Sequence, residues 1–276
     1  MLQKKREGIE LEQMRVDLHN HTTLCNHATG TVEEYVQRAI ELGIDEYGFS
    51  DHAPMNYDPK YRMDVSQRSL YEKWVLDAKE KYKNEIKVLL GYEVDYLDGY
   101  LLDEIINAKV DYLIGSVHFL KNKNDMWGFD NPEFIGVYAS VDIDKVWEDY
   151  FFAIKSMAKT GYFDIAGHLD LIKVFRFLPK KDIRLIAKEA LKEIKKSNMV
   201  IEINPAGLRK PIGETYPSRQ ILEEAYDLGI NITFGSDAHS IEHIGFGYEE
   251  SVSLVREIGY KSCVTFENRD RKLVDF

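Results

Sequence analysis

The sequence predicts a single α/β domain folded as a parallel barrel, and three observations support that fold class. Short apolar runs rich in β-branched residues, typical of strands buried in a parallel sheet, alternate with longer helical patterns along the whole chain. These strand–helix units recur about every 30 residues, which favours a barrel over an open sheet. Most of the histidines follow directly after a predicted strand, where such barrels build their active sites. The expected architecture is therefore a TIM-like (β/α)7 barrel.

Seven short apolar segments are the predicted parallel strands of this barrel. They cover residues 15–18, 46–49, 87–92, 112–117, 164–167, 199–203 and 231–235. No linker or low-complexity stretch interrupts them, so we expect one domain over residues 15–276, preceded by a polar extension at residues 1–14.

The segments between the strands carry the spacing of amphipathic helices. In residues 31–42 the apolar positions follow the i, i+3, i+4, i+7, i+8 pattern, with Thr29 or Thr31 as the cap and Gly43 as the end. Ser218 is the expected N-cap of a later helix. The predicted helices cover residues 31–42, 66–83, 146–160, 181–197, 218–228 and 248–258.

Composition argues against several classes of protein. The formal net charge of −11 argues against a basic face that would hold nucleic acid. No apolar run reaches the roughly 18 residues of a membrane span, and the N-terminal residues lack the apolar core of a signal peptide. Only Cys25 and Cys263 are present, which is no disulfide framework and predicts a cytoplasmic location.

Nine side chains that bind divalent metals cluster at or after the ends of the predicted strands. In His19-Asn20-His21 and in Asp237-Ala238-His239, residues i and i+2 point to the same side of an extended chain and can share one ion. The full set is His19, His21, His27, His52, Glu93, His118, His168, Asp237 and His239.

This set exceeds what one ion can bind, so we expect two or three ions, and clusters of that kind hydrolyse phosphate esters. Glu93 lies in an apolar strand, where a carboxylate is rarely left unpaired, and its two oxygens can bridge two ions. Cys25 lies among these histidines, and we interpret it as a small free thiol beside the site.

The motifs also resemble a known family. The HxH pair, the histidine six residues later, SDH, the isolated glutamate, GSVHF, GHLD and SDAH are similar to those of the polymerase-and-histidinol-phosphatase (PHP) superfamily, over residues 15 to about 266. The segments GYEVDY, DYLIGSVHFL, FDIAGHLDLIK and INPAGLRKP…ETYPS resemble in particular the PHP-type histidinol-phosphatases of histidine biosynthesis.

The resemblance implies a distorted (β/α)7 barrel with a trinuclear site of zinc, iron or manganese. By this resemblance, the first ion is bound by His19, His21, Glu93 and Asp237, the second by Glu93, His118 and His168, and the third by His27, His52 and His239. The implied reaction is hydrolysis of L-histidinol phosphate, a small phosphomonoester, by attack of a metal-bound hydroxide.

Phosphate oxygens suit arginine, whose planar fork donates two hydrogen bonds. Arg209 is the first candidate, because the strand before it supplies no metal ligand, and Lys173 or Arg176 after His168 is the second. Asp51, beside His52, is either a hydrogen-bond partner behind the metal ligands or a proton donor.

Two other functions remain open at this point. The same site could serve a phosphoesterase for sugar phosphates, nucleotides or nucleic-acid ends, although the acidic net charge disfavours nucleic acid. A non-catalytic metal-binding protein is disfavoured, because structural zinc sites are closed and often rich in cysteine.

Overall fold

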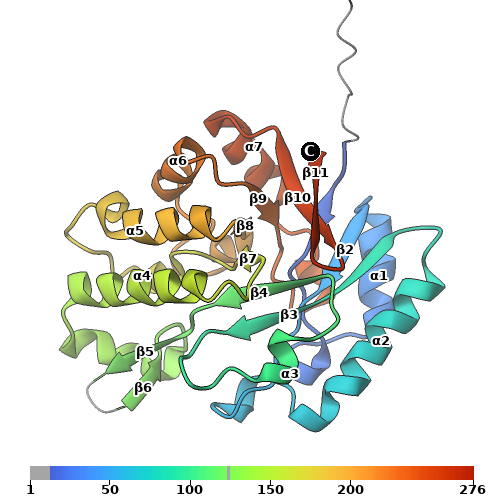
Figure 1. The fold of residues 1–276 in the computed structure, drawn as a ribbon, viewed down its shortest axis with the longest axis horizontal. Coiled ribbons are helices and arrows are strands. Elements are labelled where there is room, and N and C mark those ends of the chain that lie inside the picture. The colour runs from blue at the N-terminus through green and yellow to red at the C-terminus, as the bar shows by residue number, and fades with distance from the viewer. Residues whose placement is uncertain (1–12, 123–124) are drawn as a thin grey trace, which may run out of the picture.

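A curved sheet of parallel strands forms the centre of the molecule, with helices packed around it (Figure 1). The computed structural model describes residues 13–122 and 125–276. The order along the sheet is β1 (Val16–Asp17), β2 (Glu46–Phe49), β3 (Lys87–Asp95), β4 (Tyr112–Ser116), β7 (Ile165–Ala166), β8 (Val200–Ile203) and β9 (Ile232–Phe234).

The two outer strands of this sheet approach one another, so the barrel is nearly closed. Leu18 N donates to Phe234 O at 2.9 Å, and Asn20 forms an isolated parallel bridge with Ala238. The seven strands coincide with the seven predicted segments, and the expected α/β barrel is confirmed.

Strand β3 runs further than the sequence predicts. It continues to Asp95 because Glu93 and Asp95 keep their parallel pairing with Ile114 and Ser116 of β4. Glu93 therefore lies inside a strand, with backbone fixed on both sides, and not after the strand's end.

Six long helices surround the barrel, each in the place that the sequence predicts. Thr31 caps the first of them with a capping box, in which its side chain accepts from Glu34 N and the Glu34 side chain reaches back. Ser218 stands at an N-cap without a side-chain hydrogen bond, and its backbone N–H donates to Asp170 instead. The helices are α1 (Val32–Glu41), α2 (Arg68–Lys81), α4 (Ile143–Lys159), α5 (Ile183–Lys196), α6 (Arg219–Asp227) and α7 (Tyr248–Ile258), with a single short turn at α3 (Asp103–Ile106). Within the part of the chain that is described, none of them is both long and apolar enough to cross a membrane.

Two antiparallel hairpins add to the predicted elements. The first joins β5 (Phe119–Asn122) to β6 (Asp125–Gly128), and the second joins β10 (Ser262–Glu267) to β11 (Asp270–Asp275). They lie on opposite sides of the molecule in Figure 1.

The β10–β11 hairpin covers the end of the barrel at which the strands begin. Thr265 hydrogen-bonds Glu46, the first residue of β2, and Arg269 N donates to Asp111 O just before β4 at 2.9 Å. On its inner face, Phe266 packs with Tyr112, their ring centroids 5.9 Å apart. Apolar side chains of the hairpin therefore cover the barrel core at the end where the strands begin.

The hairpin also meets the start of the domain. Met14 N donates to Asp275 O at 2.8 Å, and Gln13 forms a bridge with the same residue. Of the predicted polar extension, residues 1–12 lie outside the described residues, whereas the last two residues, Gln13 and Met14, contact β11.

Cys25 and Cys263 are both buried, and neither forms a disulfide bond.

We expect Phe266→Ala to destabilise the protein by about 3 kcal/mol, because it leaves a cavity where a fully buried ring closes the core. Urea unfolding followed by circular dichroism measures this difference. Leu273→Ala, on the neighbouring strand with a side chain that is 44% exposed, is the control and should cost well under about 1 kcal/mol. Equal losses from the two variants would contradict the role of Phe266.

Candidate metal centre

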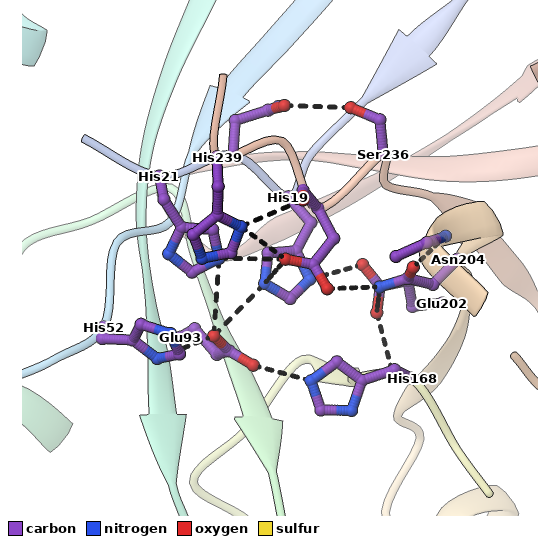
Figure 2. Close-up of polar contacts among 12 residues, drawn as sticks. His19, His21, His52, Glu93, His168, Glu202, Asn204, Ser236 and His239 are labelled. Carbon is purple, nitrogen blue, oxygen red and sulfur yellow. Dashed lines mark hydrogen bonds and ion pairs between the residues drawn. The ribbon is translucent and has the colours of Figure 1, made fainter. Parts of the chain in front are cut away.

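The predicted ligands converge at the end of the barrel where the strands finish, around one cavity of about 770 Å³. His19 and His21 lie fully buried at its base, and Figure 2 shows them beside Glu93. The remaining predicted ligands line the cavity itself: His27, His52, Glu93, His118, His168, Asp237 and His239. The structure therefore brings all nine predicted side chains together.

Glu93 occupies the centre of the cluster, and its two oxygens face different imidazoles (Figure 2). Its Oε2 lies 2.9 Å from His52 Nδ1, 3.3 Å from His19 Nε2 and 3.6 Å from His21 Nε2. Its Oε1 lies 2.8 Å from His168 Nε2 and 3.7 Å from His118 Nε2. One carboxylate thus contacts two separate sets of metal-binding groups, the geometry that a bridging ligand needs.

The HxH and DxH segments face one another, as same-side geometry at i and i+2 requires. Asp237 Oδ1 lies 3.3 Å from His21 Nε2 and 4.0 Å from His19 Nε2. His239 Nδ1 lies 3.4 Å from the same carboxylate oxygen, and its ring centroid is 4.0 Å from that of His21. Asn20, between the two histidines, turns away and donates to the Asp17 carboxylate at 3.0 Å.

Five overlapping groups of described residues at this end of the barrel have ligand atoms within 4.8 Å of one another, close enough to share an ion. They are His19, His21 and Glu93; Glu93, His118 and His168; His21, His52 and His239; His21, Cys25 and Asp51; and Cys25, His27 and His239. The second is a set expected from the sequence, and the first is the expected set of four without Asp237. The expected set of His27, His52 and His239 is divided between two of these groups. In the last group, the Cys25 thiol lies within 4.8 Å of nitrogen atoms of His27 and His239. The sequence placed Cys25 beside the site but did not predict that it comes this close to the proposed ligands.

Unpaired imidazole nitrogens indicate that cations belong in this cluster. His19 Nε2, His21 Nε2 and His239 Nε2 are buried and make no well-aligned hydrogen bond among the described residues, although a carboxylate oxygen lies 3.3 Å from each of the first two. Buried polar atoms are normally paired, so three orphaned nitrogens in one cluster point to missing partners. Imidazole and carboxylate donors suit zinc, iron and manganese, so the residues present fit the metal ions that the sequence leads us to expect.

The electrostatics of the cluster divide the imidazoles into two sets. Burial lowers the pKa of His19, but the carboxylates of Glu202 and Glu93 outweigh it and raise that pKa well above its ordinary value. The pKa of His21 is raised to about 9 and that of His118 to about 10, in each case by carboxylates that outweigh burial. Divalent ions bind where these protons would sit, so metal binding competes with protons.

The second set of imidazoles disfavours protonation. Burial, together with the charge of His52, lowers the pKa of His27 to about 4. Burial also lowers the pKa of His52, and it lowers that of His239 strongly, with His21 adding to the effect. Neutral imidazoles are the form that binds metals, so this side of the cluster is ready for a cation at neutral pH.

Carboxylates behind the imidazoles fix the orientation of the rings. Glu202 Oε1 lies 2.6 Å from His19 Nδ1, and Glu202 Oε2 accepts from the backbone N–H of His168 at 2.7 Å. Asp95 pairs with His118 Nδ1 and with the buried Arg62, whose Nη1 is 2.6 Å away. Such partners set the tautomer and basicity of a metal-binding histidine.

Sequence reasoning missed Glu202, Asp95 and Arg62, although a signal was present for the two acids. Glu202 lies in an apolar strand, as Glu93 does, so the same argument about buried carboxylates applies to it. Asp95 stands two residues after Glu93, on the same side of a strand. The sixth predicted strand therefore contributes to the site through Glu202.

Asp51 is fully buried, and it is not among the described residues that line the cavity. Its carboxylate accepts from His52 N at 2.8 Å and from Thr22, and it lies 3.4 Å from His21 Nδ1. Of the two roles that the sequence left open, these contacts fit the hydrogen-bond partner that holds His21.

The three predicted phosphate-binding side chains are placed differently. Arg209 lines the cavity, its Nη2 donating to the carbonyls of Ser236 and Asp237 at 3.1 Å, while its buried Nη1 has no partner among the described residues. Lys173 is buried behind the cavity, its Nζ 2.8 Å from Thr215 O and 3.2 Å from Asp170. Neither Lys173 nor Arg176 is among the described cavity-lining residues, so Arg209 alone of the three is positioned to meet a ligand there.

A parallel barrel with overlapping histidine and carboxylate groups at the ends of its strands defines the class of metal-binding barrel enzymes that carry out hydrolysis. The PHP domain model matches residues 17–206, and the chain belongs to the PHP domain family.

Two relatives agree with this membership, and a solved structure agrees with the fold. The chain is 36% identical over 258 residues to the "Probable histidinol-phosphatase" of Deinococcus radiodurans, covering 92% of this chain and 96% of that protein. It is 30% identical over 258 residues to the histidinol-phosphatase of Bacillus subtilis, covering 84% and 96%. The fold matches that of a histidinol phosphate phosphatase of Lactococcus lactis, which was crystallised with zinc, L-histidinol and phosphate. The TM-score is 0.77 at 21% sequence identity, and the match covers 95% of this chain and 100% of that one.

Glu202→Ala should weaken zinc binding about 10- to 100-fold, because His19 loses the carboxylate that orients it. Competition with a chromogenic chelator measures the affinity. Glu189→Ala, an exposed acid on α5, is the control and should bind zinc as the wild type does. Wild-type affinity in Glu202→Ala, with a comparable melting temperature, would show that Glu202 does not support the centre.

Proposed function

We propose that this chain is a metal-dependent phosphomonoesterase that hydrolyses L-histidinol phosphate to L-histidinol and phosphate. One observation carries the proposal: Glu93 joins two metal-binding groups in a cavity that Arg209 also lines. The names of the Deinococcus radiodurans and Bacillus subtilis relatives, a probable histidinol-phosphatase and a histidinol-phosphatase, support the choice of substrate. The match covers 96% of the length of each of these proteins.

We assign three ions to the cluster. His19, His21, Glu93 and Asp237 would hold the first ion, and Glu93, His118 and His168 would hold the second. The ligand atoms of His19, His21 and Glu93 lie together, as do those of Glu93, His118 and His168, and Asp237 Oδ1 lies 3.3 Å from His21 Nε2. His27, His52 and His239 would hold the third: His52 and His239 belong to one of the groups, and His27 and His239 belong to another with Cys25. Zinc, iron and manganese all fit these donors, and zinc is the metal in the Lactococcus lactis structure.

Bound divalent ions would supply an acidified water as nucleophile and would neutralise charge on the phosphoryl oxygens. The residues of the chain position the reactants. Arg209 donates from Nη1 to a phosphoryl oxygen while its Nη2 remains bonded to two backbone carbonyls, so the guanidinium is held in place before the substrate arrives. Asp51, Asp95 and Glu202 hold the rings of His21, His118 and His19 in fixed orientations.

Phosphate release by the purified, metal-loaded protein tests this function. We expect L-histidinol phosphate to be preferred over glucose 6-phosphate, AMP and a single-stranded oligonucleotide with a terminal phosphate. Glu93→Ala should abolish release and lower the bound metal, because both metal-binding groups lose their shared ligand.

Circular dichroism of Glu93→Ala should show an intact fold, since the replaced group is polar and lies at the base of the cavity. Preference for a sugar phosphate or a nucleotide would favour the alternative, a phosphoesterase for another small phosphomonoester. Full activity of Glu93→Ala would exclude the bridging role.

Arg209→Ala should raise KM for phosphomonoesters about 10-fold or more, because a charged hydrogen bond to the phosphoryl group is lost. Steady-state kinetics at saturating metal measure the change. Arg219→Ala, a surface arginine on α6, serves as the control. An unchanged KM would place the phosphate contact on another residue.

A further inference from the structure

Among the described residues that line the cavity, one acidic side chain is neither used by the metal centre nor paired with a cation. Asp130 follows β6 and lines the cavity, yet it belongs to none of the proximity groups of metal-binding atoms. Within residues 13–122 and 125–276, no hydrogen-bond donor or cationic side chain pairs with its carboxylate. The other unassigned acid of the cavity wall, Asp58, lies 3.7 Å from the Arg62 guanidinium.

Backbone contacts hold Asp130 in a defined place relative to the metal centre. On one side of it, Phe129 N donates to the carbonyl of His118 at 3.2 Å, and Phe129 O accepts from Tyr138 Oη at 3.1 Å. On the other side, Asn131 N donates to Gly128 O at 3.2 Å, and the Asn131 side chain caps the following helical turn. The carboxylate is thus carried on a turn tied directly to a proposed metal ligand.

The charge of Asp130 reaches the interior of the site. Burial raises the pKa of Tyr138, and Asp130 adds to the effect. Burial lowers the pKa of His118, and Asp95 and Glu93 raise it. Asp130 makes a smaller contribution in the same direction as these two carboxylates. A cation bound in the cavity beside His118 would therefore meet an uncompensated negative charge.

Aromatic side chains form the outer wall next to this turn. Tyr57 packs edge-on against Phe119, their centroids 5.2 Å apart, and its hydroxyl donates to Met126 O at 3.4 Å. Tyr61 and Phe134 line the same cavity. Away from Arg209, the cavity therefore offers one unpaired carboxylate and several aromatic side chains, which fits a phosphate ester carrying both an ammonium group and a planar ring.

We propose that Asp130 is the specificity-determining residue that binds the ammonium group of the substrate. The inference rests on the proposed function, since L-histidinol phosphate carries its ammonium on the carbon next to the phosphorylated methylene. The Asp130 carboxylate accepts hydrogen bonds from this ammonium, and the imidazole of the substrate lies along the aromatic wall. Phosphate esters without an ammonium group leave Asp130 unpaired and bind less well.

Two substrates that differ only in the ammonium group test this assignment. They are L-histidinol phosphate and its deamino analogue, 3-(imidazol-4-yl)propyl phosphate. For Asp130→Asn we expect kcat/KM to fall about 30-fold for L-histidinol phosphate, mainly through KM, and to change less than about twofold for the analogue. Where the analogue is hydrolysed too slowly, its inhibition constant against L-histidinol phosphate gives the same comparison.

Asp125→Asn removes the same charge from an exposed position on β6 that does not line the cavity, and it should leave both substrates unaffected. Metal content and melting temperature of both variants should match the wild type, and Asp130→Glu should restore part of the preference. An equal loss for both substrates, or no loss for either, would overturn the role of Asp130.

Failure of the proposed function gives a different result. In that case the wild type itself would not hydrolyse L-histidinol phosphate, whereas failure of the present inference leaves the wild type active and Asp130→Asn unselective. A wild type inactive on both substrates would overturn the two proposals together.

Discussion

The buried carboxylate of Glu93 is the constraint on which the rest of the site depends. It is 1% exposed, and five imidazoles lie within 3.7 Å of its two oxygens. Burial alone would favour its neutral form, yet the facing imidazoles, His52 and His19 foremost, hold the pKa of Glu93 well below its ordinary value. A buried charge of this kind persists only where cations compensate it, so the arrangement is organised around positive charge.

The barrel satisfies this constraint by bringing ligands from separate strands to one end. Glu93 is held inside β3, where pairing with β4 continues beyond it, so strand pairing fixes the backbone of the central ligand on both sides. The other proposed ligands come from segments that follow the strands and can adopt irregular conformations, such as the positive φ of 20° at His168 and 53° at Asp237. A rigid bridge with adaptable surrounding ligands is a geometry that several ions can share.

Sequence reasoning predicted the seven strands and the convergence of nine possible metal ligands, because buried strands and strand-end ligands leave local patterns. It did not predict what depends on contacts between distant segments. The pairing of Glu202 with His19 joins residues 183 positions apart, and the burial of Lys173 depends on Thr215, 42 positions away. The β5–β6 hairpin was missed because its strands are short and interrupted by polar residues, and the helical α7 pattern gave no hint that a second hairpin follows.

The β10–β11 hairpin that covers the base of the barrel imposes an order on folding. Its side chains complete the inner core, and its last residues bond to Gln13 and Met14, so the first strand and the final segment of the domain meet. These contacts span nearly the whole chain, and closing so long a loop is slow, so the nascent protein passes through a stage with exposed apolar surface at which chaperones can act.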